Sequence, residues 1–177
     1  MIRPEFKKIL LDQRGAAVIL WSFFAISIPI YLVITRQLLG NPNLGTNPAI
    51  AEPSRIVFWI LTVIDLGYYG YWRQKNLTPQ AIRRDARQTK LFRSVADFNG
   101  VDEQNAAYIV STYVTRKVVI FAIIEAIAVY GFVLAFVGRF VTDQIALSVL
   151  SLLLLAVEFP GQKALDNLLA AGDERKS

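Results

Sequence analysis

Two carboxylates lie inside long apolar runs of this sequence and are the residues best suited to do chemistry. Glu125 lies within IFAIIEAIAVYGFVLAFVG, residues 120–138, and Asp65 interrupts IVFWILTVIDLGYYGYW, residues 56–72. A charged side chain at the centre of a bilayer costs about 2.5 to 3.5 kcal/mol on insertion scales, so such acids usually face other helices or a wet cavity and often carry function. We therefore treat Glu125 and Asp65 as the candidate functional groups.

The positions of the two acids predict that both lie near the middle of a membrane. Asp65 is about nine residues from the outer end of its run and Glu125 about seven from the inner end of its own, so in antiparallel helices their depths agree within about one turn. No Lys or Arg lies deep in either run. Two neighbouring carboxylates share a proton more readily than both ionise. Hydroxyl groups available to bond them are those of Ser27, Thr62, Tyr68, Tyr69 and Tyr130.

Two roles fit these acids. In the first, both stay protonated and pin helix to helix, because polar side chains hold membrane helices together by about 0.6 to 2 kcal/mol each. In the second, Glu125, alone or together with Asp65 and Tyr130, reversibly binds a proton or Na⁺.

Small residues follow Glu125 along one side of the same predicted helix. They are Ala128, Gly131, Ala135 and Gly138. Small side chains let two helix backbones approach closely in a membrane. We therefore expect this face to pack tightly, either within its own bundle or against another subunit.

The stretch EAIAVYGFVLA, Glu125 to Ala135, resembles the second helix of the c subunit (proteolipid) of rotary ATP synthases. The resemblance covers about eleven residues. It implies that Glu125 corresponds to the ion-carrying acid of that family, and that Tyr130 and Gly131 correspond to its Tyr-Gly pair. It also implies proton or Na⁺ transport as a function.

Composition and apolar patterning predict an all-α integral membrane protein of four spans. Apolar residues make up 54% of the 177 residues and gather in long runs. A helix needs about 20 apolar residues to cross the hydrocarbon core. The predicted spans are residues 15–35, with a kink at Pro29, then 56–72, 118–138, and 142–159, the last with Thr142 as N-cap and Pro160 and Gly161 as its stop. We expect residues 1–177 to form one polytopic domain.

The distribution of Lys and Arg predicts the orientation, because basic residues near helix ends resist translocation. The N-terminus, the segment 73–117 and the C-terminal tail carry the basic clusters, whereas residues 37–54, between the first two spans, carry none and are flanked only by Arg36 and Arg55. We therefore expect both termini in the cytoplasm, and place the protein in a bacterial inner membrane.

Residues 74–117 form the only sizeable polar segment and predict two helices on the cytoplasmic side. Thr78 before Pro79 is a typical helix start, and the helix then expected through Phe98 mixes apolar and basic residues. Such a helix suits anionic lipid headgroups at about 1 kcal/mol per basic residue, although it could serve only to fix topology. We expect no nucleic-acid binding. The residues predicted to contact headgroups are Arg83, Arg84, Arg87, Lys90 and Arg93. From residue 101 a helix is expected to run unbroken into the third span.

The absence of Cys and His from the sequence removes several chemistries. A thiolate or imidazole metal site, a histidine general base and a disulfide all need one of these residues. No nucleotide-binding loop and no nucleophile with its base is recognisable. We therefore expect no enzymatic activity and no cofactor or metal. The sequence favours a non-catalytic membrane subunit or scaffold that contacts itself or other subunits, with proton or Na⁺ handling as the alternative.

Overall fold

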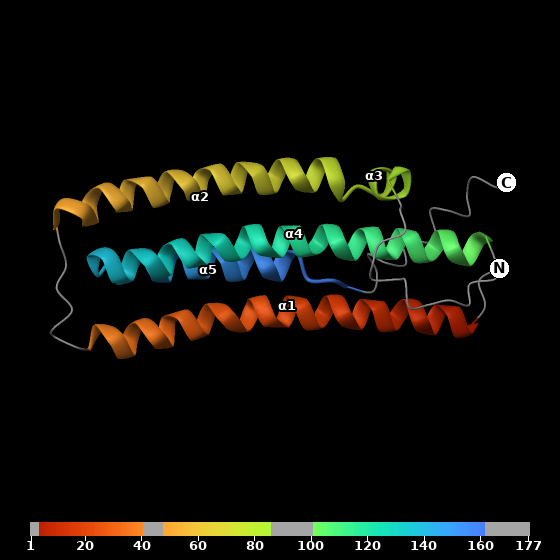
Figure 1. Cartoon of the computed structure of the whole chain (residues 1–177), viewed down its shortest axis with the longest axis horizontal. Coiled ribbons are helices and arrows are strands. Elements are labelled where there is room, and N and C mark those ends of the chain that lie inside the picture. Colours follow the sequence, from red (N-terminus) through yellow and green to blue (C-terminus); the bar gives the residue numbers. More distant parts are fainter. Residues whose placement is uncertain (1–3, 41–47, 86–100, 162–177) are drawn as a thin grey trace. The chain divides into compact units, whose positions relative to one another are not determined.

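The computed structural model describes residues 4–40, 48–85 and 101–161, with side chains from residue 14, 49 and 106 onward in these three stretches. All regular structure in them is helical (Figure 1), which confirms the all-α class. The helices are α1 Pro4–Leu39, α2 Pro48–Asn76, α3 Pro79–Arg84, α4 Val101–Gly138 and α5 Val141–Val157.

Three helices are longer than the spans predicted from the sequence. Helices α1 and α2 both begin at a proline, Pro4 and Pro48, a residue that is favoured in the first helical turn because its missing N–H would have no partner there. Helix α1 continues through Pro29. Helix α4 runs unbroken from Val101 to Gly138, which confirms the prediction that this helix continues into the third apolar run.

Helix α3 starts where the sequence predicts and ends earlier. The side-chain oxygen of Thr78 accepts a hydrogen bond from the backbone N–H of Ala81 at 3.4 Å, as an N-cap does. The helix ends at Arg84, with Asp85 at its C-cap, whereas the sequence predicted a helix through Phe98. The remainder of that predicted helix lies outside the described residues.

The start of α5 corrects one prediction. Phe140, and not Thr142, occupies the N-cap position, and it makes no side-chain capping bond. The preceding Arg139 has φ 55°, the left-handed conformation that turns the chain between α4 and α5. Asp143 lies in the first turn of α5, where the helix dipole favours a carboxylate. Such a carboxylate compensates in part for the missing cap.

The chain packs as two compact units. The first unit contains residues 1–20, 72–119 and 159–177, and the second contains residues 21–71 and 120–158. Helices α1, α2 and α4 each contribute one part to each unit. We call these the first unit and the second unit below. The single domain predicted from the sequence stays a prediction.

The first unit has a core of mostly small and branched side chains, with one tyrosine, around α4. Its buried residues are Ala17, Ile82, Ala106, Ala107, Val110, Tyr113 and Val114. Arg116 reaches beyond this core and donates to the carbonyl of Asn76 at 2.6 Å and to the carboxylate of Asp85 at 2.8 Å. These bonds tie α4 to the end of α2 and to α3.

The second unit is built from segments of four helices, those of α1, α2, α4 and α5. Its apolar core centres on Ile127, Leu134 and Leu147, with α2 contributing Phe58 and Leu66. Helix α1 joins through Tyr31, whose ring lies 5.1 Å from that of Phe132.

Two stretches in the described part of the chain are long and apolar enough to cross a membrane. They are Arg14–Leu39 of α1 and Ala106–Gly138 of α4. Helix α5 is apolar but has only 17 residues, and α2 does not meet the same criterion. The residues around Asp65 that were predicted to span a membrane are therefore helical. Their crossing of the membrane stays a prediction.

Candidate functional site

Glu125 lies in the second unit, half-buried on α4 and facing two hydroxyl groups of α1. Its Oε1 is 3.0 Å from Ser27 Oγ and 2.9 Å from Tyr31 Oη. Ser27 was among the donors predicted from the sequence, and Tyr31 was missed. The spacing of four residues between them places both hydroxyls on one face of α1. Glu125 thus links α4 to α1.

The hydrogen bonds of Ser27 allow Glu125 to be either protonated or ionised. Ser27 Oγ is 2.8 Å from the carbonyl oxygen of Phe24, which can only accept, and 3.0 Å from Glu125. A hydroxyl has one hydrogen. If Ser27 donates to Phe24, a protonated Glu125 can donate to Ser27. If Ser27 donates to Glu125 instead, an ionised Glu125 accepts from both Ser27 and Tyr31.

Asp65 has a different partner. The hydroxyl of Tyr130, on α4, interacts with the carboxylate of Asp65, on α2. The ring of Tyr130 also lies 5.5 Å from that of Phe58 on the same helix as Asp65. This second acid therefore links α2 to α4.

The two acids belong to separate side-chain clusters. Glu125 and Tyr130 are five residues apart on α4, and at about 100° per residue their side chains leave the helix about 140° apart. The Glu125 cluster faces α1, whereas the Asp65 cluster joins α2. Direct coupling between the two acids stays a prediction.

The small residues that follow Glu125 lie inside the second unit. A Cβ atom placed on Gly131 would lie 3.0 Å from Gln144 Cα and 3.1 Å from Leu147 Cβ, so the backbone of α4 touches α5 here. Ala128 and Ala135 are fully buried. A Cβ on Gly138 would collide with the ring of Phe140. Of the two kinds of packing expected from the sequence, the structure shows close packing within the chain.

One ion pair and one hydrogen bond join α2 to the two ends of α5. Arg55 donates to both oxygens of Asp143, at 2.6 and 3.2 Å, and its guanidinium carbon lies 4.9 Å from the centre of the Phe140 ring. Tyr69 donates to the buried Glu158 at 2.7 Å. Arg55 and Glu158 therefore both bind partners inside the second unit.

The predicted headgroup residues are described only in part. Arg83 and Arg84 lie on α3, and Arg84 pairs with Asp85 at 3.0 Å. The two guanidinium groups of Arg84 and Arg116 lower the pKa of Asp85 from 3.8 to about 2. Arg87, Lys90 and Arg93 lie outside the described residues.

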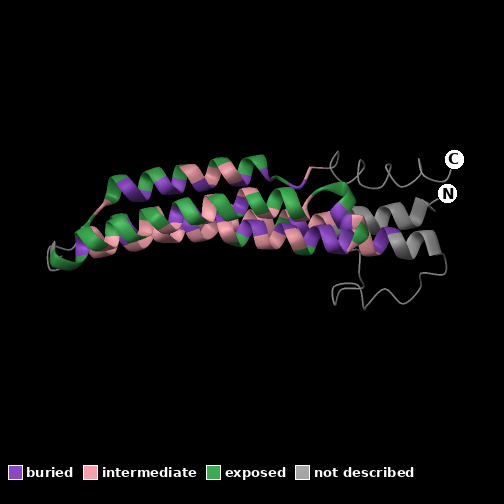
Figure 2. Ribbon diagram, turned by 90° about the horizontal axis from the view of Figure 1, so that it is seen from above, coloured by how far each residue is buried: buried purple, intermediate pink, exposed green. Residues whose placement is uncertain are grey.

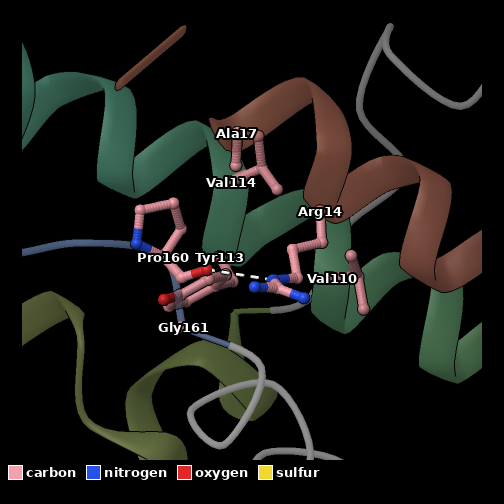
Figure 3. A pocket seen from close by; sticks show the side chains of 7 residues that line it. All are labelled: Arg14, Ala17, Val110, Tyr113, Val114, Pro160 and Gly161. Atoms are coloured by element: carbon pink, nitrogen blue, oxygen red, sulfur yellow. Dashed lines mark hydrogen bonds between the residues drawn. The ribbon is translucent and has the colours of Figure 1, made fainter. Parts of the chain in front are cut away.

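A small hollow in the first unit is lined by residues of α1, α4 and the segment after α5. Arg14 lies at its edge and donates from Nε to the carbonyl of Pro160 at 3.1 Å, as Figure 3 shows. Its walls are otherwise mostly apolar side chains such as those of Val110 and Val114. This hollow has too few polar groups to suggest a ligand.

Comparison with known proteins gives no match. No protein-family model, curated protein or solved structure matches this chain. In the described part of the chain, no three His, Cys, Asp or Glu residues gather as a metal site would require. The functional argument therefore rests on the residues of the chain itself.

The partners that sequence reasoning missed are residues without an unusual local pattern. Tyr31 and Thr35 look like ordinary members of an apolar helix, and Gln144 like a polar residue near a helix start. One signal was available: hydroxyl residues four apart, as in Ser27 and Tyr31, lie on one helix face and can serve one partner.

Proposed function

We propose that this chain is an integral membrane protein of four spans with no catalytic role, in which the two acids organise contacts between helices. The observation that carries the proposal is the distribution of side chains in the second unit. Apolar residues cover much of its outside, and many polar ones lie inside. A bilayer stabilises that distribution, because lipid covers apolar faces while buried polar groups bond each other.

The exposed residues of the second unit include long apolar rows. Exposed and buried positions alternate along its helices (Figure 2). The exposed apolar residues include Phe23, Ile26, Ile30 and Val33 on α1, Ile56, Ile60, Val63 and Ile64 on α2, and Ile145, Val149, Leu153 and Val157 on α5. Water-soluble proteins rarely expose apolar patches of this extent.

The buried residues of the second unit include many polar side chains. They are Thr35, Thr62, Asp143, Gln144, Ser148, Ser151 and Glu158. The four helical segments of this unit advance roughly 25 to 36 Å at about 1.5 Å per residue, close to the thickness of a bilayer core. These lengths support a crossing by all four, α2 included, since its Asp65 interacts with Tyr130 of α4.

The scaffold role follows from what each acid joins. Glu125 connects α4 to α1, Asp65 connects α2 to α4, and Glu158 connects α5 to α2. A hydrogen bond of this kind contributes about 0.6 to 2 kcal/mol to helix association in membranes. The acids therefore help select one arrangement of four otherwise similar apolar helices. As partners we propose anionic lipid headgroups and further membrane subunits or a second copy.

Membrane crossing is tested by single-cysteine labelling, for which a chain without Cys is well suited. We compare Glu52→Cys, Gln80→Cys and Thr142→Cys, all at exposed positions. With both termini in the cytoplasm of a bacterium, a membrane-impermeant maleimide should label positions 52 and 142 in intact cells and position 80 only after permeabilisation. Labelling of 52 and 80 from the same side would contradict the crossing of α2.

Proton or Na⁺ handling by Glu125 is a second candidate function. The arrangement of Ser27, Phe24 and Tyr31 favours it, because it bonds Glu125 in both protonation states. The resemblance of residues 125–135 to the proteolipid helix points the same way.

Dicyclohexylcarbodiimide, an apolar reagent that attacks protonated carboxyls within the bilayer, distinguishes the two functions. For an ion carrier, labelling of Glu125 falls as pH rises or Na⁺ is added. For a fixed structural bond, Glu125 reacts equally little at every pH, and the ion-handling proposal fails. Glu125→Gln serves as the unreactive control.

A further inference from the structure

The second unit contains a row of buried polar residues on one face of α5. Gln144, Ser148 and Ser151 are spaced by four and three residues, so they lie on the same side of the helix. Gln144 and Ser151 are 0% exposed, and Ser148 is 1% exposed. Val149 and Leu153, on a different face, are 50% and 61% exposed. Helix α5 thus turns these three polar side chains inward.

The amide group of Gln144 has a defined orientation. One of its atoms lies 3.2 Å from the backbone carbonyl of Tyr31, which only accepts, so this atom must be the nitrogen Nε2. The same nitrogen donates to Thr35 Oγ1 at 2.8 Å. The oxygen Oε1 therefore points the other way, where it is buried and no protein group donates to it.

Ser148 presents a second buried polar atom without a protein partner. Its Oγ has none, although the side chain is buried. The serine one turn further, Ser151, differs because its Oγ donates to the carbonyl of Leu147 at 2.9 Å. Ser148 therefore lacks the bond to its own helix that satisfies Ser151.

We propose that Gln144 Oε1 and Ser148 Oγ bind water inside the second unit. Residues four apart on a helix are neighbours, with Cβ atoms about 5 to 6 Å apart, a separation that water can bridge. Water can donate to the amide oxygen and either donate to or accept from the hydroxyl. Buried water in proteins typically makes about three such bonds to groups that would otherwise be unsatisfied.

Gln144, which binds this water, is joined to the Glu125 cluster through Tyr31. The backbone carbonyl of Tyr31 accepts from Gln144, and its hydroxyl donates to Glu125. Gly131 brings the backbone of α4 against Gln144, so three helices meet at this point. The proposed water lies beside this meeting point, on the side of Gln144 that faces away from the carbonyl of Tyr31. This inference rests on the membrane placement proposed above.

Hydrogen-to-deuterium exchange of a single thiol tests the proposal. Ser148→Cys introduces the only thiol of the chain, and its S–H stretching band in the infrared shifts when the thiol exchanges in D₂O. The matched control is Ser151→Cys, on the same buried face at a position satisfied by its own helix. We expect the thiol at position 148 to exchange at least about tenfold faster, and Gln144→Leu to slow it. Equal rates at 148 and 151 overturn the water site.

A separate measurement reports on membrane placement. Val149→Cys is treated with a charged, water-soluble thiol reagent, with the exposed Thr142→Cys as reference. Slow reaction at 149 and fast reaction at 142 support lipid cover over this face of α5. Equally fast reaction at both positions contradicts the membrane placement, while the comparison of 148 with 151 still decides whether water is bound.

Discussion

At the scale of residues, the two acids differ in what they bind. Glu125 has two hydroxyl partners on α1, and Asp65 has the hydroxyl of Tyr130 on α4. In each pair a neutral amide could keep the contact, because its NH₂ donates to an oxygen and its carbonyl accepts from a hydroxyl. An amide can therefore replace the carboxylate in helix packing, whereas it cannot replace a carboxylate that takes up and releases a proton.

A double-mutant cycle with Glu125→Gln and Asp65→Asn follows from this. We expect each variant to change the free energy of unfolding in detergent by less than about 1 kcal/mol, because each amide retains its partner. We expect the two effects to add within about 0.5 kcal/mol, since the acids have separate donors. A larger interaction energy would mean that the acids are coupled. Glu125→Leu, which removes the bonds to Ser27 and Tyr31, is the disruptive control.

Asp85 supplies a prediction about acid stability. Its pKa, lowered to about 2 from 3.8 by Arg84 and Arg116, means that the folded protein binds the proton of Asp85 less readily than the unfolded chain. Its stabilising contribution is therefore complete above about pH 4 and is lost as pH falls toward 2. At pH 6 the Asp85→Asn variant should unfold at a lower temperature than the wild type. The difference should shrink at pH 2, and a difference independent of pH contradicts the assignment.

At the scale of elements, the contact between α4 and α5 depends on Gly131. An alanine there would bring its Cβ within 3.0 Å of Gln144 Cα, closer than carbon atoms normally approach. We expect Gly131→Ala to destabilise the protein by about 1 to 3 kcal/mol, as overpacking does, and Gly131→Leu to prevent folding. Gly67→Ala on α2 is the matched control, because nothing lies within 4 Å of its added carbon. Equal stability of the two alanine variants, measured by thermal unfolding, would rule out the tight contact.

The elements also show how far sequence reasoning reaches. Long apolar runs and the cap at Thr78 were enough to predict the class, the path of α4 and the start of α3. The prediction of Thr142 as N-cap of α5 was wrong, because Arg139 adopts a left-handed conformation and Phe140 precedes the helix without a polar cap. Hydrogen-bond partners such as Tyr31 and Gln144 could not be predicted, since they depend on which helix faces meet.

At the scale of the whole molecule, the basic residues outside the second unit predict a dependence on lipid charge. Those described in the first unit include Arg73, Lys75, Arg83 and Arg84. In nanodiscs, anionic lipid should raise the unfolding temperature relative to zwitterionic lipid. Moving from about 0.1 M to 1 M salt should reduce this difference, because the screening length falls from about 10 Å to 3 Å. A lipid effect unchanged by salt would exclude an electrostatic cause, and the doubly substituted Arg83→Gln, Arg84→Gln chain should show a smaller effect.

The bond from Arg14 to Pro160 has a consequence for the order of synthesis. It joins residues 146 positions apart, and the first unit takes segments from both ends of the chain. Every residue of the second unit has been translated once Glu158 is made, whereas the first unit still lacks its last segment. During translation the second unit can therefore close first, and Arg14 of α1 gains this partner only once Pro160 has been made.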